Sequence, residues 1–137
     1  MAGSESSVLV AYDGSDVARR ALEHAADLVG SGGAVSVINV VEAQSVSSRL
    51  VTVSDAQRTN QDELLGEAER LLARRNVRAN LIRAAGDRST EILSAARALD
   101  ADVIVVGRNK QTAPHLVHRS LSSALARRAS ADVLVVH

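Results

Sequence analysis

The stretch VLVAYDGS, residues 8–15, decides the fold class of this chain. Its first five residues form an apolar run that is too short for a helix and is typical of a strand buried on both faces. An Asp-Gly pair ends the strand, and Ser15 is a favourable N-cap for a helix. Residues 16–29 carry apolar side chains at helical spacing, and Gly30 is a favourable helix stop. The stretch therefore predicts a buried strand that leads directly into a helix.

The alternation of strand and helix continues to the end of the chain. Further strands are predicted over residues 34–41, 77–82, 103–106 and 133–136. Helices are predicted after a capping box at Ser54, after a cap at Asp87 or Ser89, and over residues 120–129. This order predicts an α/β fold with an open, doubly wound, five-stranded parallel sheet and helices on both faces, built by residues 1–137 as a single domain. The half-polar strand at residues 77–82 is predicted to lie at an edge.

Composition excludes several classes of protein. The chain has 137 residues, 16 basic and 16 acidic side chains and no net charge, and Tyr12 is its only aromatic residue. Nucleic-acid binding relies on a basic surface or on stacking aromatics, so we expect no nucleic-acid partner, and we expect no flavin. The chain lacks cysteine and its four histidines form no ligand set, so we expect neither a metal site nor catalytic residues. No apolar stretch approaches the ~20 residues of a membrane helix, so we expect no membrane partner and a cytoplasmic location.

Open parallel sheets bind ligands beyond the carboxyl ends of their strands, where the strand order reverses. If the reversal lies between the first and the fourth strand, the Asp13–Ser15 turn faces the segment that begins at Gly107. We therefore place the candidate site in this crevice. Tyr12 precedes the turn, and we expect its fluorescence to report on the crevice.

Several segments resemble the universal stress protein family, in the same order along the chain. They are residues 8–15 with Ala18 and Ala21, then Gly86, Ile92 and Ala96, then ADVIVVG at residues 101–107, and VLVV at residues 133–136. The resemblance spans nearly the whole chain. It implies the strand order 3-2-1-4-5, homodimers, and a regulatory or protective role more often than an enzymatic one.

One branch of this family binds ATP through a loop of pattern G-x2-G-x9-G-[ST] after the fourth strand, and this chain departs from that pattern. Gly107 supplies the first glycine, but Asn109 or Lys110 occupies the position of the second. Counting back from the last strand puts Arg119 at the third glycine, followed by Ser120, whereas counting forward from Gly107 gives Ser120 and then leucine. We prefer the first count, because loops tolerate changes of length better than helices do. The loop therefore lacks two of the three glycines with which backbone amides approach a phosphate.

The candidate nucleotide or anion site consists of Asp13, Val40, Gly107, Arg108, Lys110, Arg119 and Ser120. By the resemblance, Asp13 matches an acidic residue near the nucleotide, and Val40 matches a residue that packs against adenine. Asp13 is also a favourable turn residue, and Val40 is equally suited to an ordinary core position. The basic side chains of the loop could hold an anion by charge alone, or could form a solvated loop.

Two functions are compatible with these residues, and we favour the first. In the first function, the chain is a dimeric regulatory or interaction module of the stress response. It would lack canonical ATP binding and a cofactor, and it would act through protein partners. Its homodimer would form through the apolar terminal strand Val133 to Val136, because an exposed strand edge invites pairing with a second copy. The alternative is a member that binds ATP or another nucleotide in the crevice and hydrolyses ATP weakly. A flavodoxin-like electron carrier fits the fold but not the lack of stacking aromatics.

Overall fold

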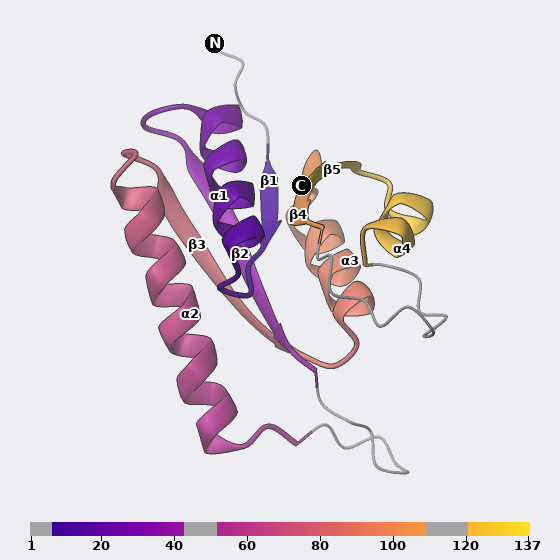
Figure 1. Ribbon diagram of the computed structural model, residues 1–137. Helices are drawn as coiled ribbons and strands as arrows, with labels where there is room; N and C mark the ends of the chain where they lie inside the picture. Colours follow the sequence, from indigo (N-terminus) through magenta and orange to yellow (C-terminus); the bar gives the residue numbers. More distant parts are fainter. Residues whose placement is uncertain (1–6, 43–51, 109–120) are drawn as a thin grey trace.

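The computed structural model describes residues 7–42, 52–108 and 121–137 (Figure 1). Strands and helices alternate strictly within these ranges. In chain order they are β1 (Val8–Ala11), α1 (Asp16–Val29), β2 (Ala34–Val41), α2 (Asp55–Ala73), β3 (Arg78–Ala85), α3 (Arg88–Leu99), β4 (Val103–Gly107), α4 (Leu121–Arg128) and β5 (Asp132–Val136). No helix in the described ranges is long and apolar enough to span a bilayer.

The five strands form one parallel sheet in the order β3-β2-β1-β4-β5, which confirms the predicted fold class and strand order. β1 lies at the centre, with Val10 opposite Val37 of β2 on one side and opposite Val105 of β4 on the other. β3 and β5 are the two edges, as their patterns predicted. From β1, the next two strands extend the sheet toward one edge and the last two extend it toward the other, so the strand order reverses at β1.

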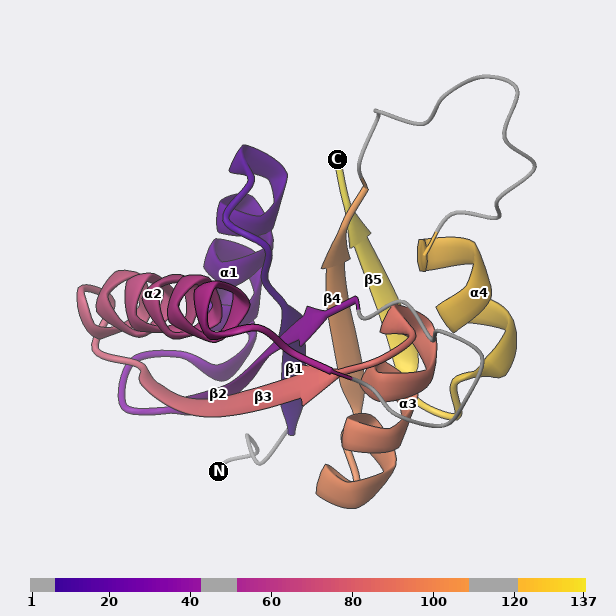
Figure 2. The ribbon, with the colours of Figure 1, turned by 90° about the horizontal axis from the view of Figure 1, so that it is seen from below.

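Helices cover both faces of the sheet and enclose two separate apolar clusters (Figure 2). Successive strand residues point to opposite faces, so Val8, Val10 and Tyr12 pack under α1 and α2. Leu9 instead belongs to the cluster under α3 and α4, together with Ile104. Most of these buried side chains are Ala, Val, Leu and Ile, because the sequence offers no larger apolar residue except Tyr12.

The predicted helix ends are confirmed where local chemistry decides them. The Ser15 hydroxyl accepts a hydrogen bond from the backbone amide of Ala18, and Gly30 ends α1 with φ +78°. Both bonds of the capping box between Ser54 and Gln57 are present at the start of α2. Each cap satisfies a backbone amide that the first turn of a helix leaves unpaired.

The end of the third strand was predicted too early. β3 continues to Ala85, and each of its eight residues has a partner on β2. The chain turns only at Gly86, whose φ of +138° suits glycine alone. Asp87, rather than Ser89, then caps α3 by accepting a hydrogen bond from the amide of Thr90.

Candidate functional site

The carboxyl ends of β1 and β4, where the sequence predicts the crevice, lie side by side in the sheet. These strands are direct neighbours, and each connects to a helix on a different face of the sheet. α1 follows β1 after the short turn at residues 12–15, and it also packs against β4. The turn at Asp13 and the end of β4 at Gly107 therefore lie at the same end of the sheet, where the carboxyl ends of its strands meet, as the predicted topology required.

Asp13 is exposed, and its carboxylate already has a partner. Its Oδ1 accepts a hydrogen bond from the backbone amide of Ser15 at 2.9 Å. Gly14, between them, has φ +85°. Aspartate commonly closes a turn in this way, so the geometry gives Asp13 the turn role that was one of its two interpretations.

Gly107 ends β4 in direct contact with α1. A Cβ atom built on Gly107 would lie 2.8 Å from Cγ1 of Val17 and 3.1 Å from the carbonyl carbon of Val17. Real side chains do not approach so closely, and backbone cannot move aside easily. The close packing of α1 on β4 is therefore a sufficient reason for glycine at this position, independent of any ligand.

The other candidate residues differ in how they are placed. Val40 is partly buried and packs into the cluster under α3 and α4, opposite Ala84 of β3. Arg108 is exposed, and its backbone amide donates to the carbonyl of Val136 at 2.7 Å. Lys110, Arg119 and Ser120, with the loop that contains them, lie outside the described residues. The structure thus brings Asp13 and Gly107 to the same end of the sheet, and the loop's role stays a prediction.

The sequence did not reveal a buried polar bridge at the carboxyl ends of β1, β2 and β3. Asn39 is 8% exposed, and its Nδ2 donates to the carbonyl oxygen of Tyr12 at 2.8 Å. Gln61 of α2 is 5% exposed, and its Nε2 lies 2.8 Å from the carbonyl oxygen of Asn39 and 3.1 Å from that of Ala84. The two amide groups thus add side-chain hydrogen bonds to backbone carbonyls at the carboxyl ends of the strands. The one available signal was Asn39 itself, a polar residue inside an apolar strand.

Tyr12 precedes Asp13 in the sequence and was therefore expected to lie beside the crevice, but the structure places its side chain elsewhere. Its ring is 2% exposed and packs in the cluster under α1 and α2, and its hydroxyl donates to the carboxylate of Glu67. Burial and the negative charge of Glu67 raise the pKa of Tyr12 well above its ordinary value. Arg19 lies 3.6 Å from Glu67 and partly balances that charge. Tyr12 therefore reports on the α1–α2 packing more directly than on the crevice.

Among the described residues, no three side chains of His, Cys, Asp or Glu gather closely enough to hold a metal ion. The described part of the candidate site contains an aspartate that accepts a backbone hydrogen bond and a tightly packed glycine. Such a site can contact a ligand through backbone groups and through Arg108. It contains no arrangement of nucleophile and base in its described part.

A parallel sheet with strand order 3-2-1-4-5, whose order reverses at β1, defines a doubly wound α/β protein. The model of the universal stress protein family matches residues 6–137, and the chain belongs to that family. The predicted family is thereby confirmed. Among curated proteins, none matches this sequence.

Solved structures of universal stress proteins share this fold. The UspA protein of Lactobacillus plantarum is 19% identical, with 99% of this chain and 100% of that chain covered and a TM-score of 0.79. A universal stress protein in complex with cAMP is 25% identical, with 98% and 99% covered and a TM-score of 0.74. The protein from Archaeoglobus fulgidus in complex with dAMP is 20% identical, with 98% and 99% covered and a TM-score of 0.70. At these identities the likeness concerns the fold.

Proposed function

We propose that this chain is a dimeric regulatory or interaction module of the stress response that lacks canonical ATP binding. The observation that carries this proposal is the replacement of two loop glycines, one by Asn109 or Lys110 and one by Arg119. A phosphate on a backbone cradle needs the close approach that glycine allows, and a bulky side chain at that position occupies the space.

The described edge of the crevice supports the same proposal. The carboxylate of Asp13 accepts a hydrogen bond from the amide of Ser15, and this turn role is a sufficient reason for aspartate at this position. Gly107 is packed under Val17, so the one motif glycine that remains has a structural reason to be there. Neither residue needs a ligand to explain its identity.

The proposed dimer forms through β5, the edge strand of the sheet. Leu134 is 37% exposed, although it lies opposite Val105 in the register and therefore faces the same side as the α1–α2 cluster. On the other face, Val133 and Val135 pack into the cluster under α3 and α4. A second copy added edge to edge would pair the free backbone groups of β5 and would cover Leu134.

The second candidate function is binding of an adenine nucleotide in the crevice, with weak hydrolysis if the nucleotide is ATP. It is favoured by the two relatives whose structures hold cAMP and dAMP. In this candidate Asp13, Gly107 and Ser120 keep the roles that the resemblance implies, and the guanidinium of Arg119 pairs with a phosphate. Monophosphates need less of the missing glycine cradle than ATP does.

Calorimetric titration with ATP and magnesium, and separately with cAMP, distinguishes the two candidates. The parent chain is expected to bind ATP no more tightly than about 1 mM, a level at which charge alone can account for binding. The Arg119→Gly variant restores one glycine, and a gain of affinity on this variant identifies the side chain as the obstacle. Tight ATP binding by the parent chain would overturn the first candidate. No heat from either nucleotide on either protein would overturn the second.

A further inference from the structure

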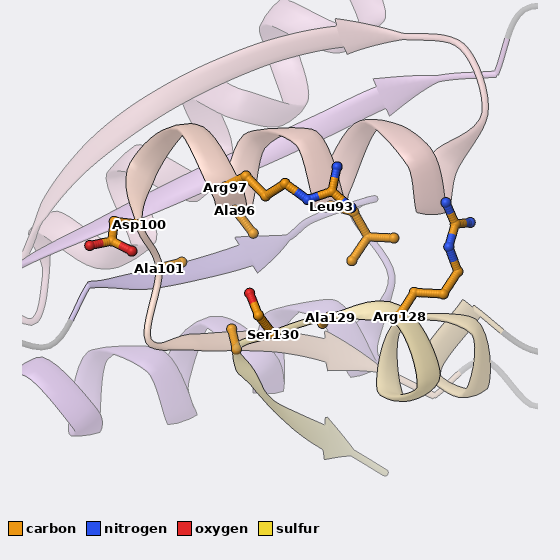
Figure 3. A pocket seen from close by; sticks show the side chains of 9 residues that line it. Leu93, Ala96, Arg97, Asp100, Ala101, Arg128, Ala129 and Ser130 are labelled. Carbon is orange, nitrogen blue, oxygen red and sulfur yellow. The ribbon is translucent and has the colours of Figure 1, made fainter.

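A hollow of about 160 Å³ lies between α3 and the segment that joins α4 to β5 (Figure 3). It adjoins the starts of two strands, because Ala101 precedes β4 and Ala131 precedes β5. The hollow therefore lies at the opposite end of these strands from the predicted crevice. An apolar cavity of about 150 Å³ holds a molecule of the size of benzene, so a ligand of this hollow would have about six or seven non-hydrogen atoms.

The middle of the hollow is apolar and continuous with the core. Leu93 and Ala96 line it from α3, and Ala129 and Ala131 line it from the joining segment (Figure 3). All four side chains belong to the cluster under α3 and α4. A short alkyl chain laid on them would lose contact with water, which is favourable, whereas a charged group there would not be satisfied.

Opposite charges lie at the two ends of this apolar middle. The carboxylate of Asp100 lies at one end, and the side chain of Arg97 extends along α3 toward Leu93 at the other (Figure 3). Residues at this spacing can pair with each other on a helix, yet these two side chains point apart. Neither joins an ion pair within the described part of the chain. The hollow thus presents a cation and an anion that are separated by an apolar surface.

Arg128 of α4 adds positive charge at the Arg97 end, but it also acts on Asp87. Asp87 caps the start of α3, where hydrogen bonds from Thr90 hold the pKa of its carboxyl below the ordinary value, and the charge of Arg128 lowers it further. Arg97 is therefore the cation that remains for direct contact with a ligand, and Arg128 contributes a longer-range attraction.

We propose that this hollow binds a linear ω-amino acid, such as 4-aminobutanoate, in which an alkyl chain separates the two charges. The carboxylate would pair with Arg97, the methylene groups would lie over Leu93 and Ala96, and the ammonium group would pair with Asp100. Leu93 and Asp100 are about 10 Å apart along α3, and contacts of about 3 Å at each end leave about 4–5 Å between the charged groups of the ligand. An α-amino acid does not meet this requirement, because both of its charges lie on one carbon.

Four probes test this assignment: 4-aminobutanoate, its isomer 2-aminobutanoate, butanoate and butylamine. Each is titrated into the full chain while the backbone amide resonances of Ala101, Ala129 and Ser130 are followed by NMR. Exposed ion pairs contribute little, so 4-aminobutanoate is expected to bind at about 1–10 mM and about fivefold more tightly than the other three. The two isomers have the same atoms and the same charges, so a difference between them measures the charge separation alone. Equal binding of the isomers, or no saturable shift from 4-aminobutanoate, would overturn the proposal.

Variants with a matched control separate a site from general surface charge. Arg97→Gln is expected to remove the preference for 4-aminobutanoate over butylamine, and Asp100→Asn to remove its preference over butanoate. Asparagine tolerates the left-handed backbone that Asp100 adopts at φ +52°, so this variant keeps the helix end. Arg127→Gln is the control, because Arg127 shares the last turn of α4 with Arg128 but does not line the hollow. A loss in Arg127→Gln as large as that in Arg97→Gln would contradict a defined site.

Discussion

Gly107 matches a functional motif and also has a structural reason to be glycine. Val17 of α1 fills the space where a side chain would start. The sequence motif alone could not distinguish a glycine kept for a phosphate from one kept for helix packing. The two explanations predict different effects on stability when a single methyl group is added at Gly107.

Gly107→Ala is expected to destabilise the fold by about 1–3 kcal/mol, because the added Cβ overlaps side chain and backbone of Val17. Chemical denaturation measures the free energy of unfolding. Gly66→Ala serves as the control, since its Cβ would meet only the end of the flexible Arg70 side chain inside α2. That variant should stabilise by up to about 1 kcal/mol through helix propensity. A neutral Gly107→Ala would contradict the packing explanation.

Tyr12 gives a pH dependence that can be followed without a label, because it is the only aromatic residue. Its pKa is raised in the fold, so the protonated hydroxyl stabilises the native state up to the unfolded value near 10 and loses that contribution as the pH rises further. Tyrosinate absorbance is expected to stay low until the chain unfolds. In Tyr12→Phe the stability should fall less steeply above pH ~10. Tyrosinate formation near pH 10 in the folded chain would contradict the buried bond to Glu67.

At the scale of elements, helix caps and the strand order were predictable, whereas the register between strands and the side-chain bridges were not. The cap at Ser15 and the capping box at Ser54 depend on residues three positions apart, and both were predicted correctly. The end of β3 depends on its register with β2, which no local pattern reveals. The Asn39–Gln61 bridge likewise joins residues that only the tertiary fold brings together. In the candidate site, Asp13 and Gly107 were placed by topology, while their existing partners, Ser15 and Val17, were not foreseen.

Gln61 links α2 to the ends of β2 and β3, so its removal tests how strongly the helix is attached there. Gln61→Ala removes the side-chain donor that bridges the carbonyl oxygens of Asn39 and Ala84, and it leaves the buried amide oxygen of Asn39 without this donor. The expected loss is about 1–3 kcal/mol in the free energy of unfolding. Asn60→Ala, at the exposed neighbouring position of α2, should change stability by less than about 0.5 kcal/mol. Equal effects of both variants would show that the bridge contributes nothing.

At the scale of the whole molecule, the sheet has two edges of different character. β3 carries Arg78 and Arg83 on its exposed positions, and charges on an edge discourage pairing with another strand. β5 offers Val133, Leu134 and Val135 in succession, with Leu134 left partly uncovered. This contrast favours β5 as the contact between two copies, and it leaves the crevice at the strand ends outside the pairing edge.

The central claim, a module that works as a two-fold dimer through β5, is tested most directly by sedimentation equilibrium of the parent chain and of Leu134→Lys. The parent chain is expected to sediment as a dimer at micromolar concentration. Leu134→Lys places a charge in the proposed contact and should shift the chain to a monomer with unchanged unfolding free energy per subunit at low concentration. Leu28→Lys, at an exposed leucine of α1, is the matched control and should remain dimeric. A parent chain that is monomeric at micromolar concentration would contradict the claim.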